Sequence, residues 1–341
     1  MWNPKTYHDE DFGLGDNESF EPDVRDDEIP IVQLIEPHIM TLLGPIVPEE
    51  LGICMPHVHL LCNPPGADED HRLTDVDSAE SEIEAFVTMN GRSLVECSTR
   101  DAGRIVTPLL EIAGWVPAHL ISVTGRHSHL YASQMPNALD QDSLTEEFVS
   151  ELTVGLEETG ARAGAIKVGT SLNDITEVER ATLQAAAEAH VRTGAPITSH
   201  TENGTMALEL IETLGLNGVA ANRVIIGHVD RVPMSLEAHL EIARSGAFLQ
   251  FDQIGKSEEY TDQMRAERVV ELIEAGFGDQ ILLSLDYARR SLLVSYDGQP
   301  GLPYLSEWFM VLLLEAGMQA MDVRRLVIEN PARALTIHPP R

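Results

Sequence analysis

Eight short apolar runs, rich in β-branched residues, alternate along this chain with longer stretches of helical periodicity, and this alternation constrains the fold more than any other feature. The helical stretches include Glu177–Thr193 and Ser235–Ser245, which end before Gly194 and Gly246, two suitable C-terminal caps. Eight strands with intervening helices predict an α/β fold, a (β/α)8 TIM barrel, in preference to a doubly wound open sheet. The eight runs are Ile53–Met55, Ser93–Cys97, Leu120–Val123, Ala165–Val168, Pro196–Ser199, Val224–Gly227, Ala247–Phe251 and Ile281–Ser284.

The sequence before the first run has a different character. Residues 1–37 are acidic, punctuated by Pro and Gly, and without apolar periodicity. Such a segment cannot bury enough apolar surface to offset its chain entropy. We therefore expect residues 1–37 to be a mobile acidic extension, and residues 38–341 to be one barrel domain.

Charge and composition limit the classes of partner. Asp and Glu number 55 against 23 Lys and Arg, and the formal net charge is −32, which argues against binding to nucleic acid or to an anionic membrane surface. Only three cysteines occur, at spacings that match neither a zinc ribbon nor a disulfide scaffold. No window reaches the roughly 18 consecutive apolar residues that a membrane helix needs. We expect a cytoplasmic protein with free thiols and a small-molecule substrate, and we leave open whether it forms a homodimer.

Metal-ligating side chains follow five of the eight runs. Because the carboxyl ends of the strands of a barrel meet at one face, these side chains are expected to converge there. Imidazole and carboxylate groups are the ligands of Zn²⁺ and similar divalent ions, so the pattern predicts a metal site. The alternative is a set of ordinary histidines in the core. The predicted ligands are His57, His59, Lys167, His200, His228 and Asp286.

Lys167 is one of only three lysines, and an ammonium group beside two dications would be repelled. Carboxylation removes this contradiction, because a lysine carbamate is an anion whose two oxygens can bridge two metal ions about 3.5–4 Å apart. The alternative role for Lys167 is an ordinary salt bridge. Two dications would also supply a hydroxide near neutral pH, and Asp286 is placed to accept the proton and route it to the leaving group.

The chain resembles the phosphotriesterase-related branch of the amidohydrolase superfamily over nearly all of residues 39–337. The resemblance implies that His57, His59 and Asp286 bind one metal ion, that His200 and His228 bind the other, and that carboxylated Lys167 and a hydroxide lie between the two ions. Zinc is the expected metal. The stretches that carry the resemblance are Gly44-Pro45-Ile46, Pro48-Glu49-Glu50-Leu51-Gly52, Arg162-Ala163-Gly164-Ala165-Ile166-Lys167-Val168-Gly169, Thr193-Gly194-Ala195-Pro196-Ile197, Val224-Ile225-Ile226-Gly227-His228 and Glu329-Asn330-Pro331-Ala332-Arg333.

The loops after the strands bear on the substrate. The short loop after the eighth run resembles the sub-branch that contains phosphorylated-sugar lactonases and an orphan enterobacterial homologue. Lys256 and Arg289 match residues that look like the phosphate clamp of those lactonases, but Leu292 stands where they have a tyrosine. His127 stands where many lactonase relatives have a tyrosine that bonds to the reacting carbonyl, and it could donate the same bond.

The sequence thus predicts a binuclear metal-dependent hydrolase, a lactonase for a small and possibly sugar-derived anionic lactone. Two alternatives stay open on the same metals, a phosphoester or phosphotriester hydrolase and an N-acyl amide hydrolase. A further alternative is a barrel that only binds a small ligand.

Overall fold

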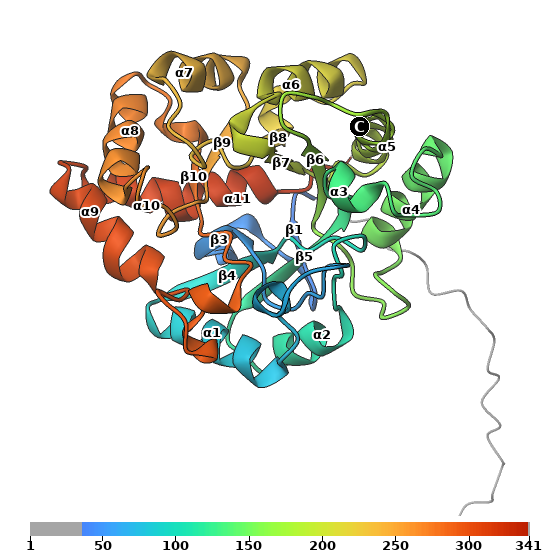
Figure 1. Ribbon diagram of the computed structural model, residues 1–341, viewed down its shortest axis with the longest axis horizontal. Coiled ribbons are helices and arrows are strands. Elements are labelled where there is room, and N and C mark those ends of the chain that lie inside the picture. Colours follow the sequence, from blue (N-terminus) through green and yellow to red (C-terminus); the bar gives the residue numbers. More distant parts are fainter. Residues whose placement is uncertain (1–35, 340–341) are drawn as a thin grey trace, which may run out of the picture. The chain divides into compact units, whose positions relative to one another are not determined.

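The computed structural model describes residues 36–339, which form a barrel of eight parallel strands surrounded by helices (Figure 1). The strands are hydrogen-bonded in the order β10-β9-β8-β7-β6-β5-β4-β3. The amide N–H of Asp286, just after β10, donates to the carbonyl oxygen of His57 in β3 over 3.0 Å and brings the two ends of the sheet together. The predicted TIM barrel is confirmed. The extension predicted for residues 1–37 falls on residues outside the described range, apart from 36 and 37.

The strand boundaries agree with the predicted runs to within three residues. The strands are β3 Ile53–Val58, β4 Gly91–Glu96, β5 His119–Gly125, β6 Ala165–Thr170, β7 Ile197–Thr201, β8 Val224–Ile226, β9 Phe248–Phe251 and β10 Ile281–Leu283. A short antiparallel hairpin, β1 Ile39–Thr41 and β2 Gly44–Ile46, precedes the barrel and was not predicted.

Most of the helices lie around the strands, whereas α11 runs across the middle of the view (Figure 1). The helices are α1 Val76–Thr88, α2 Thr107–Ala113, α3 His129–Ala132, α4 Gln141–Thr153, α5 Glu177–Thr193, α6 Ala207–Leu216, α7 Leu236–Ser245, α8 Asp262–Glu274, α9 Met310–Glu315, α10 Ala320–Arg324 and α11 Asn330–Leu335. Two π-helical segments, Leu305–Phe309 and Arg325–Glu329, run directly into α9 and α11. None of the described helices is long and apolar enough to cross a membrane.

Local sequence sets the ends of these helices. Thr176 and Glu179 form a capping box at the start of α5, and Gly194 ends the helix in the left-handed conformation, with φ 75°. In α7, Ser235 is the N-terminal cap, because its hydroxyl accepts a hydrogen bond from the amide of Ala238, and Gly246 ends the helix with φ 95°. Both predicted helices and both predicted glycine caps are therefore confirmed.

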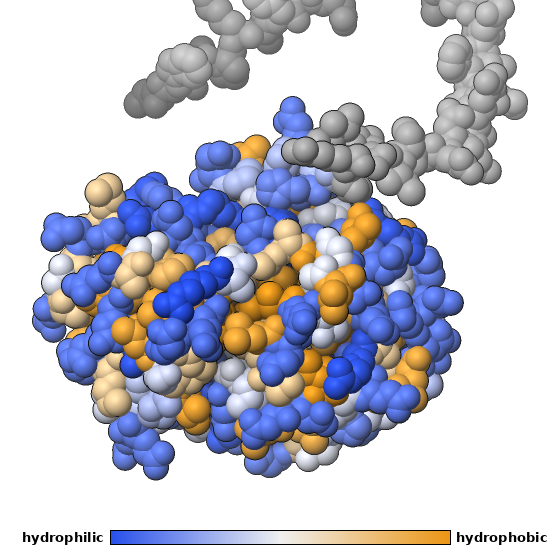
Figure 2. All heavy atoms as spheres, turned by 90° about the horizontal axis from the view of Figure 1, so that it is seen from above, coloured by the Kyte–Doolittle hydropathy of each residue, from blue (hydrophilic) through white to orange (hydrophobic). Residues whose placement is uncertain are grey.

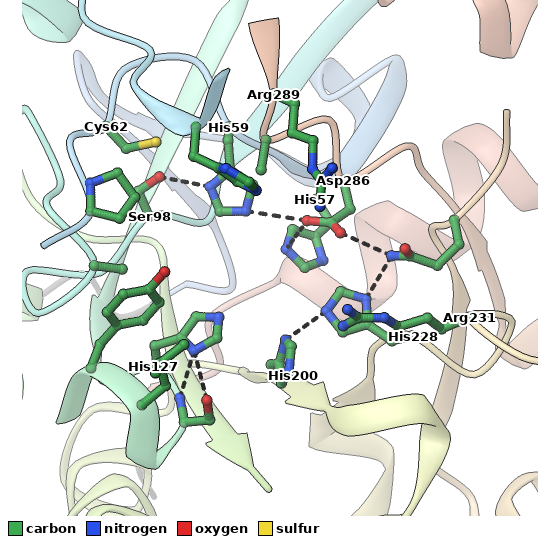
Figure 3. Close-up of a pocket in the computed structure, with 18 of the residues that line it drawn as sticks. His57, His59, Cys62, Ser98, His127, His200, His228, Arg231, Asp286 and Arg289 are labelled. Atoms are coloured by element: carbon green, nitrogen blue, oxygen red, sulfur yellow. Dashed lines mark hydrogen bonds and ion pairs between the residues drawn. The ribbon is translucent and has the colours of Figure 1, made fainter. Parts of the chain in front are cut away.

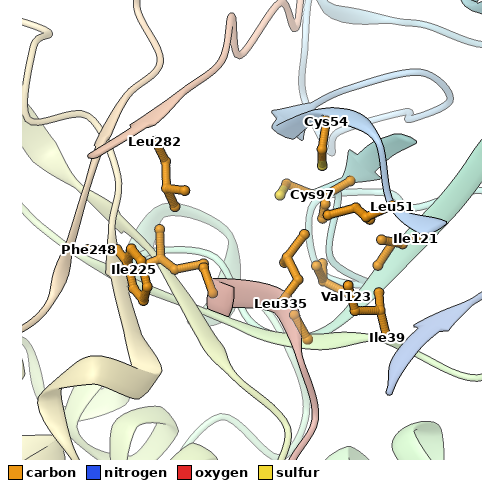
Figure 4. Packing of buried hydrophobic residues seen from close by; sticks show 13 residues of the cluster. Ile39, Leu51, Cys54, Cys97, Ile121, Val123, Ile225, Phe248, Leu282 and Leu335 are labelled. Atoms are coloured by element: carbon orange, nitrogen blue, oxygen red, sulfur yellow. The ribbon is translucent and has the colours of Figure 1, made fainter. Parts of the chain in front are cut away.

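Apolar side chains from the strands meet in one buried cluster with α11 and β1 (Figure 4). Some of the strand residues in it, such as Cys54, Ala165 and Phe248, stand near the amino-terminal ends of their strands. Leu335 of α11 and Ile39 of β1 complete the packing. Apolar side chains thus fill part of the space between the strands and α11.

One face of the barrel domain is largely hydrophilic (Figure 2). Apolar residues lie in patches between the hydrophilic ones on this face. The three cysteines are free and buried, as expected.

Candidate active site

A cavity of about 470 Å³ opens at the carboxyl ends of the strands, and all six predicted metal ligands line it (Figure 3). His57, Lys167 and His200 belong to β3, β6 and β7. His228 and Asp286 follow β8 and β10, and their backbones adopt left-handed conformations with φ 61° and 47°. A non-glycine residue adopts such a conformation only where the surroundings enforce it. The structure therefore brings together every residue that the strand-end pattern selected.

Three of these residues form one group of potential ligand atoms. Oδ1 of Asp286 lies 3.3 Å from Nε2 of His57 and 3.2 Å from Nε2 of His59. The three ligand atoms of this group all lie within 4.8 Å of one another. Two imidazole nitrogens and a carboxylate oxygen at this spacing suit a zinc-like divalent ion.

A second group lies beside the first. Nδ1 of His200 and Nε2 of His228 are 2.8 Å apart. The ring of His228 is also stacked on the ring of His57, with 5.1 Å between their centroids. The two nitrogens that face each other in the second group are the donor atoms that a second metal ion would use.

Lys167 lies beside the first group and lines the same cavity. Its Nζ is 3.2 Å from Nε2 of His57, and the residue is only 1% exposed. Within residues 36–339 no carboxylate oxygen lies within 4.0 Å of this ammonium group. A buried charge without a counter-ion is costly. An anionic carbamate that binds metal ions would remove this cost, so the donor set fits a binuclear centre.

Sequence analysis missed one carboxylate that orients the centre. Asp252 follows β9, is fully buried, and accepts hydrogen bonds from Nδ1 of His57 over 2.9 Å and from Nδ1 of His228 over 2.8 Å. Both rings therefore carry their proton on Nδ1 and present an unprotonated Nε2 to the centre. Burial raises the pKa of Asp252, but the two histidines outweigh it and hold this pKa well below its ordinary value. In the sequence, the position of Asp252 directly after an apolar run was the signal that could have identified this residue.

The other two histidines also have partners outside the centre. Nδ1 of His59 is 2.7 Å from the hydroxyl of Ser98, and Nε2 of His200 donates to the Glu202 carboxylate over 3.0 Å. Burial, more than any neighbouring charge, lowers the pKa of His57 to about 3 and that of His200 to about 4. These two imidazoles are neutral at physiological pH, which is the form that binds metal ions.

The residues predicted to bind substrate lie in the same cavity. Arg289 is exposed in the loop after β10, and Lys256, in the loop after β9, is half-buried and contacts Asp286. The ring of His127 lies 4.5 Å from that of His200, centroid to centroid. Nδ1 of His127 accepts a hydrogen bond from the amide of Ser128 over 2.7 Å, so a neutral His127 carries its proton on Nε2. That proton is available for donation.

The barrel and the polar groups at its carboxyl end define an enzyme of the TIM-barrel hydrolase class. The model of the phosphotriesterase family matches residues 37–335, and the chain belongs to that family. The predicted family and the predicted hydrolase class are both confirmed.

Three curated relatives illustrate the different activities for which members of this family are named. The phosphotriesterase homology protein of Escherichia coli is 32% identical, over 83% of this chain and 97% of the relative. An N-acetyltaurine hydrolase of Dictyostelium discoideum is 30% identical, over 78% and 75%. A phospho-furanose lactonase of Mycoplasmopsis synoviae is 30% identical, over 86% and 90%.

Among solved structures, a lactonase from Listeria monocytogenes superposes with a TM-score of 0.83 at 32% identity. The superposition covers 88% of this chain and 99% of the lactonase. The similarity thus extends over the whole barrel.

Proposed function

We propose that this protein is a binuclear metal-dependent hydrolase. His57, His59 and Asp286 would hold one divalent ion, most simply Zn²⁺, and His200 and His228 the other. Lys167, carboxylated on its Nζ, would bridge the two ions. The observation that carries the proposal is the buried Lys167 ammonium group, which faces the imidazole of His57 and has no carboxylate partner among the described residues.

The two ions, when bound, would supply a hydroxide near neutral pH and polarise the bond to be attacked. The residues of the chain provide the rest of the reaction. Asp286 accepts the proton released as water adds to the substrate and passes it to the leaving group. Nε2–H of His127 donates to the carbonyl oxygen, where negative charge develops. Asp252 keeps the rings of His57 and His228 in the tautomer that binds metal.

The substrate that we propose is a small lactone with an anionic substituent. Arg289 supports this choice because it is an exposed cation in the wall of the cavity of a strongly acidic protein. The similarity to phospho-furanose lactonases and to the Listeria lactonase supports the lactone. From the sequence, Lys256 was expected to bind the same anion.

A second candidate is the hydrolysis of an N-acyl amide that carries an anion. The relatives named N-acetyltaurine hydrolase favour it, because taurine ends in a sulfonate that Arg289 could also bind. The two candidates differ in the bond that is cleaved and share the anion. The remaining candidate of the sequence analysis is a phosphoester or phosphotriester, and of these the triester carries no negative charge and would leave Arg289 without a partner.

The test combines metal analysis with a substrate panel. Purified protein should contain close to two divalent ions per chain, and it should hydrolyse an anionic lactone with a higher kcat/KM than a neutral lactone of equal ring size. An N-acyl amide with a sulfonate and an aryl phosphotriester complete the panel. A protein with fewer than one ion per chain, and without activity after zinc is added, would contradict the proposal.

Location in the cytoplasm also stays a prediction, and the oligomeric state stays open. Gel filtration combined with light scattering would determine whether the protein is a homodimer.

A further inference from the structure

The side chain of Lys256 has no hydrogen-bond donor to spare. Its Nζ donates to Oδ2 of Asp286 over 2.7 Å, to the backbone oxygen of Asp286, and to Oε1 of Gln253 over 3.4 Å. An ammonium group has three N–H donors, and here each of them faces an acceptor of the protein itself. The ammonium group is therefore used within the protein, although it lines the cavity.

The partner of Lys256 is the carboxylate of Asp286, which we propose both binds a metal ion and accepts the proton of the reaction. Oδ2 of Asp286 is held by Lys256 and by Nε2 of Gln253 at 2.9 Å. Oδ1, the other oxygen, faces Nε2 of His57 and Nε2 of His59. The contacts on Oδ2 set the rotation of the carboxylate, and that rotation determines where Oδ1 points.

We propose that Lys256 is a positioning residue, which fixes the Asp286 carboxylate so that Oδ1 is directed at the metal centre. The anionic group of the substrate is then bound by Arg289 and not by Lys256. This inference rests on the proposed function for the identity of the centre. It differs from the sequence-based expectation, in which Lys256 and Arg289 share one anion.

The charges around the cavity support this division of roles. Lys256 is paired with Asp286, and Arg231 is paired with Glu202 over 3.1 Å. In the described part of the chain no carboxylate oxygen lies within 4.0 Å of the Arg289 guanidinium group. Of the two arginines that line the cavity, Arg289 is therefore the one whose charge is not paired with a carboxylate of the described residues. One free guanidinium group suits a substrate with one anionic group, such as a carboxylate, a sulfonate or a single phosphate.

The test uses two aryl esters of similar size, p-nitrophenyl acetate and mono-p-nitrophenyl succinate, which ends in a carboxylate. Both are assayed with the zinc-loaded wild-type protein and with the variants Lys256→Met and Arg289→Gln. Arg244→Gln is the matched control, because Arg244 pairs with Glu237 on α7 and does not line the cavity. A second readout is the rate at which zinc passes to a chromogenic chelator, followed without any substrate.

For Lys256→Met we expect kcat to fall about tenfold or more on both esters, and zinc to leave about tenfold faster, as is usual when a partner of a metal ligand is removed. For Arg289→Gln we expect KM to rise roughly tenfold on the succinate ester alone, with unchanged zinc release. A Lys256→Met protein whose only defect is a higher KM for the succinate ester would overturn the proposal.

Lys256→Arg protects the test against a variant that does not fold. Arginine keeps a cation in the cavity, but its planar guanidinium group cannot reproduce the three contacts of an ammonium group. We expect Lys256→Arg to lose kcat on both esters, whereas an anion-binding role predicts normal kinetics. If the wild-type protein binds zinc but cleaves neither these esters nor the substrates of the panel above, the proposed function fails while the zinc-release comparison still decides the role of Lys256.

Discussion

At the scale of single residues, the centre depends on neutral imidazoles that are held in one tautomer by buried partners. Asp252 does this for two rings at once. The strand-end pattern located the six predicted ligands because each one follows or ends an apolar run. It did not single out Asp252, because a sequence does not show which aspartate after a strand faces an Nδ1 atom and which faces solvent.

Lys167 gives the sharpest prediction at this scale. Lys167→Ala should lose the bridge between the two ions, and with it about one metal ion per chain and most of the activity. A short carboxylic acid added to the variant should restore part of both, because it supplies two oxygens where the carbamate stood. Metal analysis and the lactone assay, with and without added acid, measure this. Full metal content and full activity in Lys167→Ala would contradict the assignment of a carbamate.

His239 predicts a pH dependence of stability that is independent of the metal centre. It is buried on α7, where Nε2–H donates to the carbonyl oxygen of Val229 over 2.9 Å and Nδ1 accepts from Arg268 over 2.9 Å. Burial, followed by the charge of Arg268, lowers the pKa of His239 from 6.5 to about 4. The buried neutral ring of His239 contributes its whole stabilising effect above pH 6.5, where His239 is neutral in both the folded and the unfolded chain. The contribution is lost as the pH falls from 6.5 toward 4, because only the unfolded chain then binds the proton.

The loss of folding free energy attributable to His239 should reach about 3 kcal/mol near pH 4, because each tenfold difference in proton affinity between the folded and unfolded chain corresponds to about 1.4 kcal/mol. Urea unfolding of the wild-type protein and of His239→Gln between pH 7 and pH 4.5 measures it, and the variant should show the shallower pH dependence. His129→Gln, at an exposed histidine, is the control. Parallel pH profiles for wild type and His239→Gln would show that the ring is not buried in its neutral form.

At the scale of helices and strands, the sequence predicted the eight strands of the barrel and two of its helices, α5 and α7. All eight strands and the full extent of α5 follow from periodicity and from capping residues. The hairpin of β1 and β2 was missed, because strands of three residues are too short to show alternation. The contacts among Lys256, Gln253 and Asp286 were missed for another reason: they join loops that only the closed barrel brings together.

Gly194, at the end of α5, predicts a large effect from a single methyl group. Its φ is 75°, and a Cβ atom at this position would lie 1.7 Å from the backbone oxygen of His338. Gly276 has φ 91° but no atom within 4 Å of the same position, so it isolates the cost of the backbone conformation. Gly276→Ala should lose about 1–2 kcal/mol, and Gly194→Ala should lose at least about 1 kcal/mol more, because the backbone of His338 must move. Urea unfolding of both variants measures the difference, and equal losses would mean that His338 moves freely.

At the scale of the whole molecule, the net charge of −32 affects both stability and substrate approach. Repulsion among carboxylates destabilises the folded state, and salt weakens it because the Debye length falls from about 10 Å at 0.1 M to about 3 Å at 1 M. We therefore expect the melting temperature to rise as KCl is raised from about 0.1 M to 1 M. A salt-adapted cytoplasm and a GC-rich genome both account for the scarcity of lysine.

The same charge should determine how salt changes catalysis. An anionic substrate is repelled by the protein at long range and attracted only at short range, by Arg289 at the wall of the cavity. Moderate salt removes the repulsion first, so kcat/KM for an anionic lactone should rise with KCl and then flatten or fall as the contact with Arg289 is itself screened. For a neutral lactone, kcat/KM should change little with salt. In the variant Arg289→Gln, kcat/KM for the anionic lactone should still rise at moderate salt but should not fall at high salt.

Paired titrations of melting temperature and kcat/KM measure these curves. A melting temperature that falls steadily with KCl would reject the salt-adaptation hypothesis, and identical responses of the two lactones would reject the electrostatic account of substrate choice.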